Sequence, residues 1–176
     1  MNTPIMVRAA ATYDVPEIQA MEVAAGARFR EIVDPRVARC ADAPPYWTAG
    51  LEKACVEQRA WVAVDGDGRI IGFAVAWVVD GEGHLDELAV TPEHGRRGIG
   101  RELVDEVVAW TVAQHLDSIT LTTFRDVPWN APYYEKLGFH VVTPLTPALQ
   151  ALIDEQATWG LDPELRVVMR RSLTGA

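Results

Sequence analysis

The sequence has few cysteines, no long apolar run and fewer basic than acidic residues. Its 2 cysteines, Cys40 and Cys55, lie in no CxxC or Cys/His spacing, so we expect at most one disulfide and no metal site. No run approaches the roughly 18 uncharged residues of a membrane-spanning helix. The N-terminus lacks the basic segment and apolar stretch of a secretory signal. We therefore expect a soluble, cytoplasmic protein with no membrane partner.

The charge balance excludes another class of function. The chain has 16 Lys and Arg against 25 Asp and Glu, a formal net charge of −9. A general nucleic-acid-binding protein needs a basic face to neutralise phosphates, so nucleic acid is not an expected partner. The acidic excess suits cationic partners or plain solubility. With 176 residues, of which 49% are hydrophobic, residues 1–176 are expected to form a single domain.

Strand-like and helix-like segments alternate along the whole chain, and no repeat interrupts them. This pattern favours a single α/β unit. Turn residues and hydrophobic spacing place the elements. The expected strands are Pro4–Arg8, Ala60–Val64, Arg69–Val79, His84–Val90, Ser118–Phe124, Phe139–Val142 and Leu165–Arg171. The expected helices are Asp14–Phe29, Tyr46–Glu57, Gly98–His115, Asn130–Gly138 and Thr146–Gly160.

A glycine- and arginine-rich stretch lies between an expected strand and a long expected helix. It contains the consecutive residues Gly95, Arg96, Arg97, Gly98, Ile99, Gly100 and Arg101. Glycines let the backbone approach a ligand closely, and the free N–H groups and dipole of a helix N-terminus favour anions. The arginines add positive charge. The stretch therefore predicts a site for a diphosphate-bearing ligand.

Two other phosphate motifs do not fit this stretch. A Walker A loop needs a Lys and a hydroxyl where the chain has Arg101 and Glu102. A dinucleotide-binding fingerprint needs a third glycine where the chain has Leu103. An ordinary loop before a helix is the alternative with no ligand.

Two segments resemble the motifs of the GNAT superfamily of acyl-CoA-dependent N-acyltransferases. His84–Leu103 resembles motif A of that family, and Tyr133–Phe139 resembles motif B, in the family's order and spacing. The resemblance implies a mixed, mostly antiparallel sheet that is splayed at its centre and flanked by helices. It implies acetyl-CoA as the co-substrate, no metal, and transfer of the acetyl group to a primary amine.

The resemblance also implies which residues bind acetyl-CoA. The pyrophosphate would lie on the turn from Arg96 to Arg101, and the pantetheine arm would pair with the main chain of Leu88, Ala89 and Val90. Two positions depart from the family pattern. Gly95 stands where the family has Gln or Arg, and Val127 stands where it often has Asn. Asn130 is the nearest asparagine, and it could cap the following helix or contact the ligand.

Acyl transfer to an amine needs an acid and a base. Losing the proton of an alkylammonium with a pKa near 10.4 costs roughly 4.6 kcal/mol at pH 7. The oxyanion needs N–H donors, which the backbone of Leu88 to Val90 could supply. Tyr134 resembles the family's general acid, which would protonate the leaving thiolate. The alternative for Tyr134 is a packed core tyrosine.

Strand alternation places His84, Asp86 and Leu88 on one face and Leu85, Glu87 and Ala89 on the other. His84 and Asp86 match positions where some family members carry a base, often acting through water, and His titrates near neutral pH. The alternative is that both are solvated groups at a strand end. Glu87 is a weaker candidate.

The acceptor is not specified by the sequence. Tyr46 and Trp47 lie where this fold edges the acceptor pocket, or they pack a short helix. A small-molecule or peptide amine is expected, and a homodimer through the last strand is a further expectation. A non-catalytic acyl-CoA sensor and a protein N-terminal or lysine acetyltransferase remain alternatives. The excess of acidic residues could lie on the side of the site where a cationic amine enters.

Overall fold

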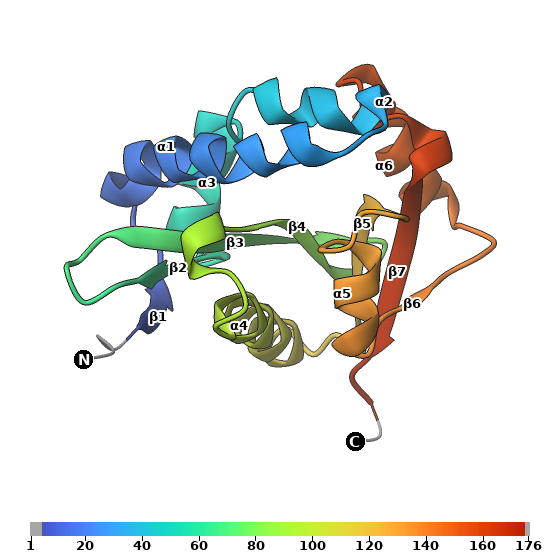
Figure 1. Ribbon diagram of the computed structural model, residues 1–176. Coiled ribbons are helices and arrows are strands. Elements are labelled where there is room, and N and C mark those ends of the chain that lie inside the picture. Colours follow the sequence, from blue (N-terminus) through green and yellow to red (C-terminus); the bar gives the residue numbers. More distant parts are fainter. Residues whose placement is uncertain (1–4, 175–176) are drawn as a thin grey trace.

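The computed structural model describes residues 5–174, which form one mixed seven-stranded sheet with helices on both faces (Figure 1). The strand order is β1-β2-β3-β4-β5-β7-β6. The strands are β1 Met6–Ala9, β2 Ala60–Val64, β3 Ile70–Val79, β4 Glu82–Val90, β5 Ser118–Phe124, β6 His140–Val141 and β7 Arg166–Ser172. The helices are α1 Val15–Gly26, α2 Pro35–Ala38, α3 Thr48–Val56, α4 Ile99–Ala113, α5 Ala131–Lys136 and α6 Pro147–Thr158.

All of the expected strands and helices are present, mostly with ends within two residues of the predicted ones. The first helix gives way to a 3-10 segment, Ala27–Glu31, before its predicted end, and Pro4 of the predicted first strand lies outside the described residues. The short helix α2 was not expected, because a single turn shows no hydrophobic periodicity. No helix within residues 5–174 combines the length and the apolar character needed to cross a bilayer.

Each face of the sheet carries its own core. Helix α4 lies against one face, where Leu103 and Val107 are fully buried. Helices α1 and α3 cover the opposite face, where Ile18 and Leu51 pack with Phe73 of β3 (Figure 1). Burial of such side chains supplies the main stabilising term of folding. The two layers therefore hold the sheet between them and fix the strands that carry the site.

The sheet is splayed at its centre, as the resemblance implied. All neighbouring strands pair antiparallel except β4 and β5, which run parallel. These two strands pair only from Gly83 to Leu85 of β4, although β4 continues to Val90. Beyond Leu85 the edge of β4 that faces β5 has no partner strand within residues 5–174. Its backbone groups are therefore available to an extended ligand.

A β-bulge at Asp86 overturns the predicted alternation along β4. Leu85 pairs with Ala76 of β3 and Glu87 pairs with the preceding Val75, so Asp86 is the extra residue. Leu85 and Leu88 consequently pack into the same core, on the α4 side of the sheet. The prediction that Leu88 shares a face with His84 and Asp86 is wrong, because the inserted residue shifts every later side chain to the other face.

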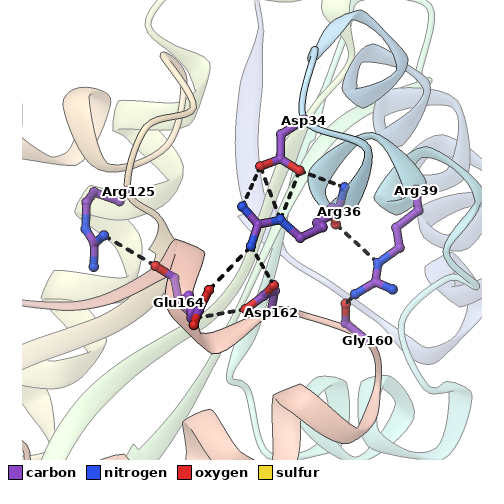
Figure 2. Close-up of polar contacts among 7 residues, drawn as sticks. All are labelled: Asp34, Arg36, Arg39, Arg125, Gly160, Asp162 and Glu164. Carbon is purple, nitrogen blue, oxygen red and sulfur yellow. Dashed lines mark hydrogen bonds and ion pairs between the residues drawn. The ribbon is translucent and has the colours of Figure 1, made fainter.

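The connection between α1 and α3 closes one end of the sheet. We call residues 27–47 the covering segment. A third, small core holds it down, with Val37 buried against Phe124 and Val127. Polar contacts join the same segment to the turn before β7 (Figure 2). Residues far apart in the sequence are thereby brought together beside the splay.

Candidate active site

The N-terminus of α4 has the geometry of an anion site. Gly98 precedes the helix with φ 88°, a left-handed conformation that glycine adopts without strain. The backbone N–H groups of Ile99, Gly100 and Arg101 have no hydrogen-bond acceptor within residues 5–174. The side chain of Ile99 is 2% exposed and belongs to the core, so only its backbone can serve a ligand. These donors and the helix dipole fit a diphosphate.

Two further observations support this fit. A Cβ added at Gly100 would lie 2.8 Å from the Tyr133 hydroxyl, so a side chain here would have to displace the Tyr133 ring. Arg96 and Arg101 are exposed, and Arg101 makes only a 4.0 Å contact to Asp105. Such solvated guanidinium groups can turn toward a phosphate at little cost.

The open edge of β4 begins beside this site. The Leu88 N–H donates to the Glu87 carboxylate at a long 3.3 Å. A donor held this weakly is available to a better acceptor, such as the carbonyl oxygen of an acyl group. Leu88, Ala89 and Val90 pair with β3 on their other side, which keeps this edge straight.

Tyr134 lies at the junction of α5 with the sheet. Its ring is buried against Tyr133 and Phe139, at centroid distances of 5.3 and 5.8 Å. Burial, together with the nearby Glu87 charge, raises the pKa of the Tyr134 hydroxyl above its ordinary value. The hydroxyl has no hydrogen-bond partner among the described residues. It is therefore a protonated donor that is free to serve a ligand.

His84 lies in the interior, 1% exposed. Its Nδ1 atom is 2.9 Å from the Thr120 hydroxyl, which itself donates to the Gly83 carbonyl. The hydroxyl therefore accepts from Nδ1–H, and Nε2 is left as a buried acceptor with no partner in the described structure. Burial lowers the pKa of His84 to about 4, so the ring is neutral near pH 7.

Asp86 is held by the covering segment. Its carboxylate accepts from the Tyr46 hydroxyl in a short hydrogen bond and from Trp77 Nε1 at 3.0 Å. The expected pairing with His84 does not form a hydrogen bond in the described structure, although the Asp86 charge still acts on the ring. The bulge turns the Asp86 carboxylate toward Tyr46 instead.

Glu87 of β4 and Glu22 of α1 lie close enough to interact electrostatically. Burial and repulsion from Glu22 and Asp86 raise the pKa of Glu87 to about 8. Burial likewise raises the pKa of Glu22 to about 7, although a 2.7 Å hydrogen bond from the Tyr46 N–H acts to lower this pKa. Two neighbouring carboxyl groups with raised pKa values can receive a cation or a proton.

Arg166 at the start of β7 completes the site. Burial lowers its pKa to about 10, while the charge of Glu87 opposes this shift. The guanidinium donates to Thr122 at 3.0 Å and to Gln156 at 2.8 Å, which fixes it near Tyr134 and Glu87. It is a permanent positive charge on the acidic side of the site.

Asn130 does not take the first of its two expected roles, that of a helix cap. Its side chain does not cap α5; its Nδ2 group donates to the Thr123 hydroxyl at 2.7 Å, which ties α5 to β5. The capping prediction is wrong because the backbone of Asn130 turns its side chain toward the strand. No group of three or more His, Cys, Asp or Glu side chains within residues 5–174 is arranged to hold a metal ion.

The sequence matches the family model described as "Acetyltransferase (GNAT) family" over residues 26–139. The chain belongs to the GNAT acetyltransferase family. A mycothiol acetyltransferase of Corynebacterium efficiens is 47% identical over 51 residues, which are 29% of this chain and 16% of that protein. The chain thus spans only a small part of that curated relative.

Solved structures of GNAT proteins share the fold. An acetyltransferase of the GNAT family from Staphylococcus aureus Mu50 superposes with a TM-score of 0.71 at 16% identity, over 97% of this chain and 100% of that one. The PaiA N-acetyltransferase of Thermoplasma acidophilum, solved with coenzyme A, gives 0.66 at 17% identity, over 96% and 99%.

Two residues of this GNAT site were missed by sequence reasoning. Glu22 lies in a helix whose hydrophobic face is not distinct, so nothing marked it as facing the sheet. Arg166 offered a weak signal, because a charged residue directly precedes the apolar run Val167–Met169. Only the folded arrangement shows that both reach Glu87.

Proposed function

We propose that this protein is an acetyl-CoA-dependent N-acetyltransferase that moves the acetyl group to a primary amine by direct attack. The observation that carries the proposal is the placement of two opposite sites along one open strand edge. The anion site lies at α4, and the Glu87–Tyr134 pair lies where β4 parts from β5. Two substrates of opposite charge can therefore meet beside Leu88.

On the first side, the free N–H groups at the start of α4 would hold the pyrophosphate, with Arg96 and Arg101 adding charge. The main chain of β4 would pair with the pantetheine arm. When bound, acetyl-CoA supplies the acetyl group in activated form, as a thioester. The Leu88 N–H would then polarise the carbonyl oxygen.

On the second side, Glu87 is the proposed base. Its pKa of about 8 lies far closer to that of an alkylammonium than that of an ordinary carboxyl does, so proton transfer to it is less unfavourable. An ammonium group between Glu22 and Glu87 also relieves their mutual repulsion. The acidic pair therefore binds the amine as a cation and then takes its proton.

Tyr134 is the proposed acid. Its raised pKa keeps the hydroxyl protonated near neutral pH, so that it can hydrogen-bond to the leaving thiolate and supply its proton. Direct attack is favoured over an acylated cysteine, because burial raises the pKa of the Cys40 thiol and leaves it protonated. Both cysteines are free, which suits a reducing cytoplasm.

His84 and Asp86 take supporting roles in this proposal. Asp86 fixes Tyr46 and repels Glu87, which keeps the pKa of Glu87 high. The partnerless Nε2 of His84 is suited to order a water molecule that carries the proton away from the site. Neither residue needs to touch the amine.

The test combines binding and turnover. Isothermal titration should show acetyl-CoA binding in the micromolar range, and a thiol assay should show CoA release with a mixture of small primary amines. Mass spectrometry should find one N-acetyl product for each CoA. Binding without release with any amine would favour a non-catalytic sensor, and absence of binding would overturn the proposal altogether.

A further inference from the structure

A polar clamp joins the covering segment to the turn before β7. Arg36 of α2 lies between three carboxylates, Asp34 at 2.9 Å, Asp162 at 3.1 Å and Glu164 at 3.5 Å (Figure 2). Arg39 donates to the Gly160 carbonyl in a short hydrogen bond. The contacts with Gly160, Asp162 and Glu164 join residues that lie more than 120 positions apart in the sequence. We call the contacts of Arg36 and Arg39 with residues 160–164 the clamp.

Apolar side chains pack beneath the clamp and leave a pocket that is partly open to solvent. Val37 is 4% exposed and packs with Phe124 and Val127, and Leu161 and Leu165 cover the edges of this cluster. The remaining cavity between the covering segment and the sheet measures about 90 Å³. The two segments therefore meet through both polar and apolar contacts.

The clamp lies next to the proposed reaction centre. Arg166 directly follows the clamped turn, and its guanidinium stacks 4.9 Å from the centre of the Phe124 ring. The same guanidinium interacts electrostatically with Cys40 of the covering segment and with Glu87 and Tyr134. Arg166 thus separates the clamp from the acid and the base. An acceptor that extended from the reacting amine past Arg166 would meet the clamped segments.

We infer, on the basis of the proposed function, that the acceptor is a small free amine and not an amine carried by a polypeptide. An extended chain needs roughly the 4.7–4.9 Å spacing of neighbouring strands on each of its sides. The clamp holds α2 and residues 160–164 at hydrogen-bond distance. A peptide would have to break these contacts to pass between them, whereas a small amine would not.

The test compares small amines with peptides as acceptors. One set contains small primary amines, including 1,5-diaminopentane and free lysine. The other contains a ten-residue peptide with a single lysine and a blocked N-terminus, and the same peptide with a free N-terminus and no lysine. The best small amine should exceed both peptides in kcat/KM by roughly 100-fold, since misplacing the reacting amine by about 1 Å costs this much.

Two variants test the role of the clamp. Arg36→Ala combined with Arg39→Ala should raise kcat/KM for the peptides about tenfold and leave the small amines unchanged. Arg30→Ala is the matched control, because Arg30 pairs with Asp42 inside the covering segment and not across to residues 160–164. Should the double variant misfold by circular dichroism, raising the salt concentration of the wild type from 0.05 to about 0.5 M should act in the same direction by screening the ion pairs.

The outcomes separate this inference from the proposed function. A peptide acetylated by the wild type as efficiently as the best small amine would overturn the inference and leave acetyl transfer intact. A small-amine preference that neither the double variant nor salt reduces would overturn the assignment to the clamp. Acetyl-CoA binding without transfer to any acceptor would overturn the proposed function instead.

Discussion

The two sides of the site are built in opposite ways. The anion side is one contiguous stretch, Gly95–Arg101, with exposed arginines and free backbone donors. The amine side gathers partly buried groups from separate elements: Glu22, Tyr46, Glu87, Tyr134 and Arg166. The first side binds charge at the surface by local geometry. The second side depends on burial, which shifts the pKa of its acids toward the values that proton transfer requires.

This difference explains how an acidic protein can bind a polyanionic co-substrate. The net charge of −9 is spread over the chain, but the start of α4 carries a local cluster of arginines at the positive end of a helix dipole. Acidic groups concentrate instead around Glu87. Changes on the two sides should consequently separate binding of acetyl-CoA from chemistry.

The largest expected effect is that of Glu87→Gln. Loss of the base should lower kcat/KM for the amine by about 10³-fold, while affinity for acetyl-CoA stays unchanged. Stopped-time assays and isothermal titration measure the two quantities, with the exposed Glu106→Gln as control. If affinity for acetyl-CoA fell as much as turnover, the claim that the two sides of the site serve binding and chemistry separately would be contradicted.

The same variant has a stability signature. The pKa of Glu87, about 8 in the folded state, exceeds its ordinary 4.5. Between these pH values the folded protein keeps a proton that the unfolded chain releases, so the free energy of unfolding falls as pH rises. Glu87→Gln removes the titrating group and with it this pH-dependent fall in the free energy of unfolding. The difference in Tm between Glu87→Gln and the wild type should therefore shift in favour of the variant as the pH is raised from 5 to 8.

A second, smaller effect is expected for Tyr134→Phe. Without the acid, kcat should fall about 100-fold with little change in affinity for acetyl-CoA, because the ring packing remains. Tyr13→Phe, at a position 78% exposed, is the control. Unchanged turnover in Tyr134→Phe would leave Tyr134 as a core residue only.

On the anion side, Arg96→Ala combined with Arg101→Ala should raise the KM for acetyl-CoA roughly tenfold and leave kcat unchanged. The remaining backbone donors explain why the loss is moderate. The KM of the wild type should also rise with salt concentration, and that of the variant should rise less. A fall in kcat with unchanged KM would contradict the assignment of these arginines.

The smallest expected effect concerns pH. Asp86→Asn removes a negative charge that raises the pKa of Glu87, so the acidic limb of the kcat/KM profile should move from near pH 8 to lower pH by about one unit. Asp67→Asn, exposed in the β2–β3 turn, is the control. An unmoved limb would show that another group titrates.

The turn before α4 could be predicted from the sequence because its signal is local. Glycine and arginine spacing before a helical pattern specifies the α4 turn without reference to the rest of the chain. The amine side could be predicted only in part. The bulge at Asp86 depends on pairing with β3, and it decides that Glu87 turns toward Glu22. Asn130 similarly bonds to Thr123, a partner that sequence spacing does not reveal.

The fold followed from alternating patterns and from the family resemblance, and the mixed, mostly antiparallel sheet with its central splay is as expected. The covering segment was not foreseen as a unit. Its short helix is stabilised by Val37 packing on Phe124 and by contacts to residues 160–164, all of which are long-range. Such contacts carry no periodic signal in the sequence.

A single-turnover experiment tests the central claim most directly. The protein, in excess over acetyl-CoA labelled in its acetyl group, is mixed with a panel of small primary amines. The label is then followed by chromatography of the small molecules and by mass spectrometry of the intact protein. We predict that all of the label passes to an amine and that none is found on the protein. Label that stays in acetyl-CoA, or that appears on the protein, would contradict direct acetyl transfer at Glu87 and Tyr134.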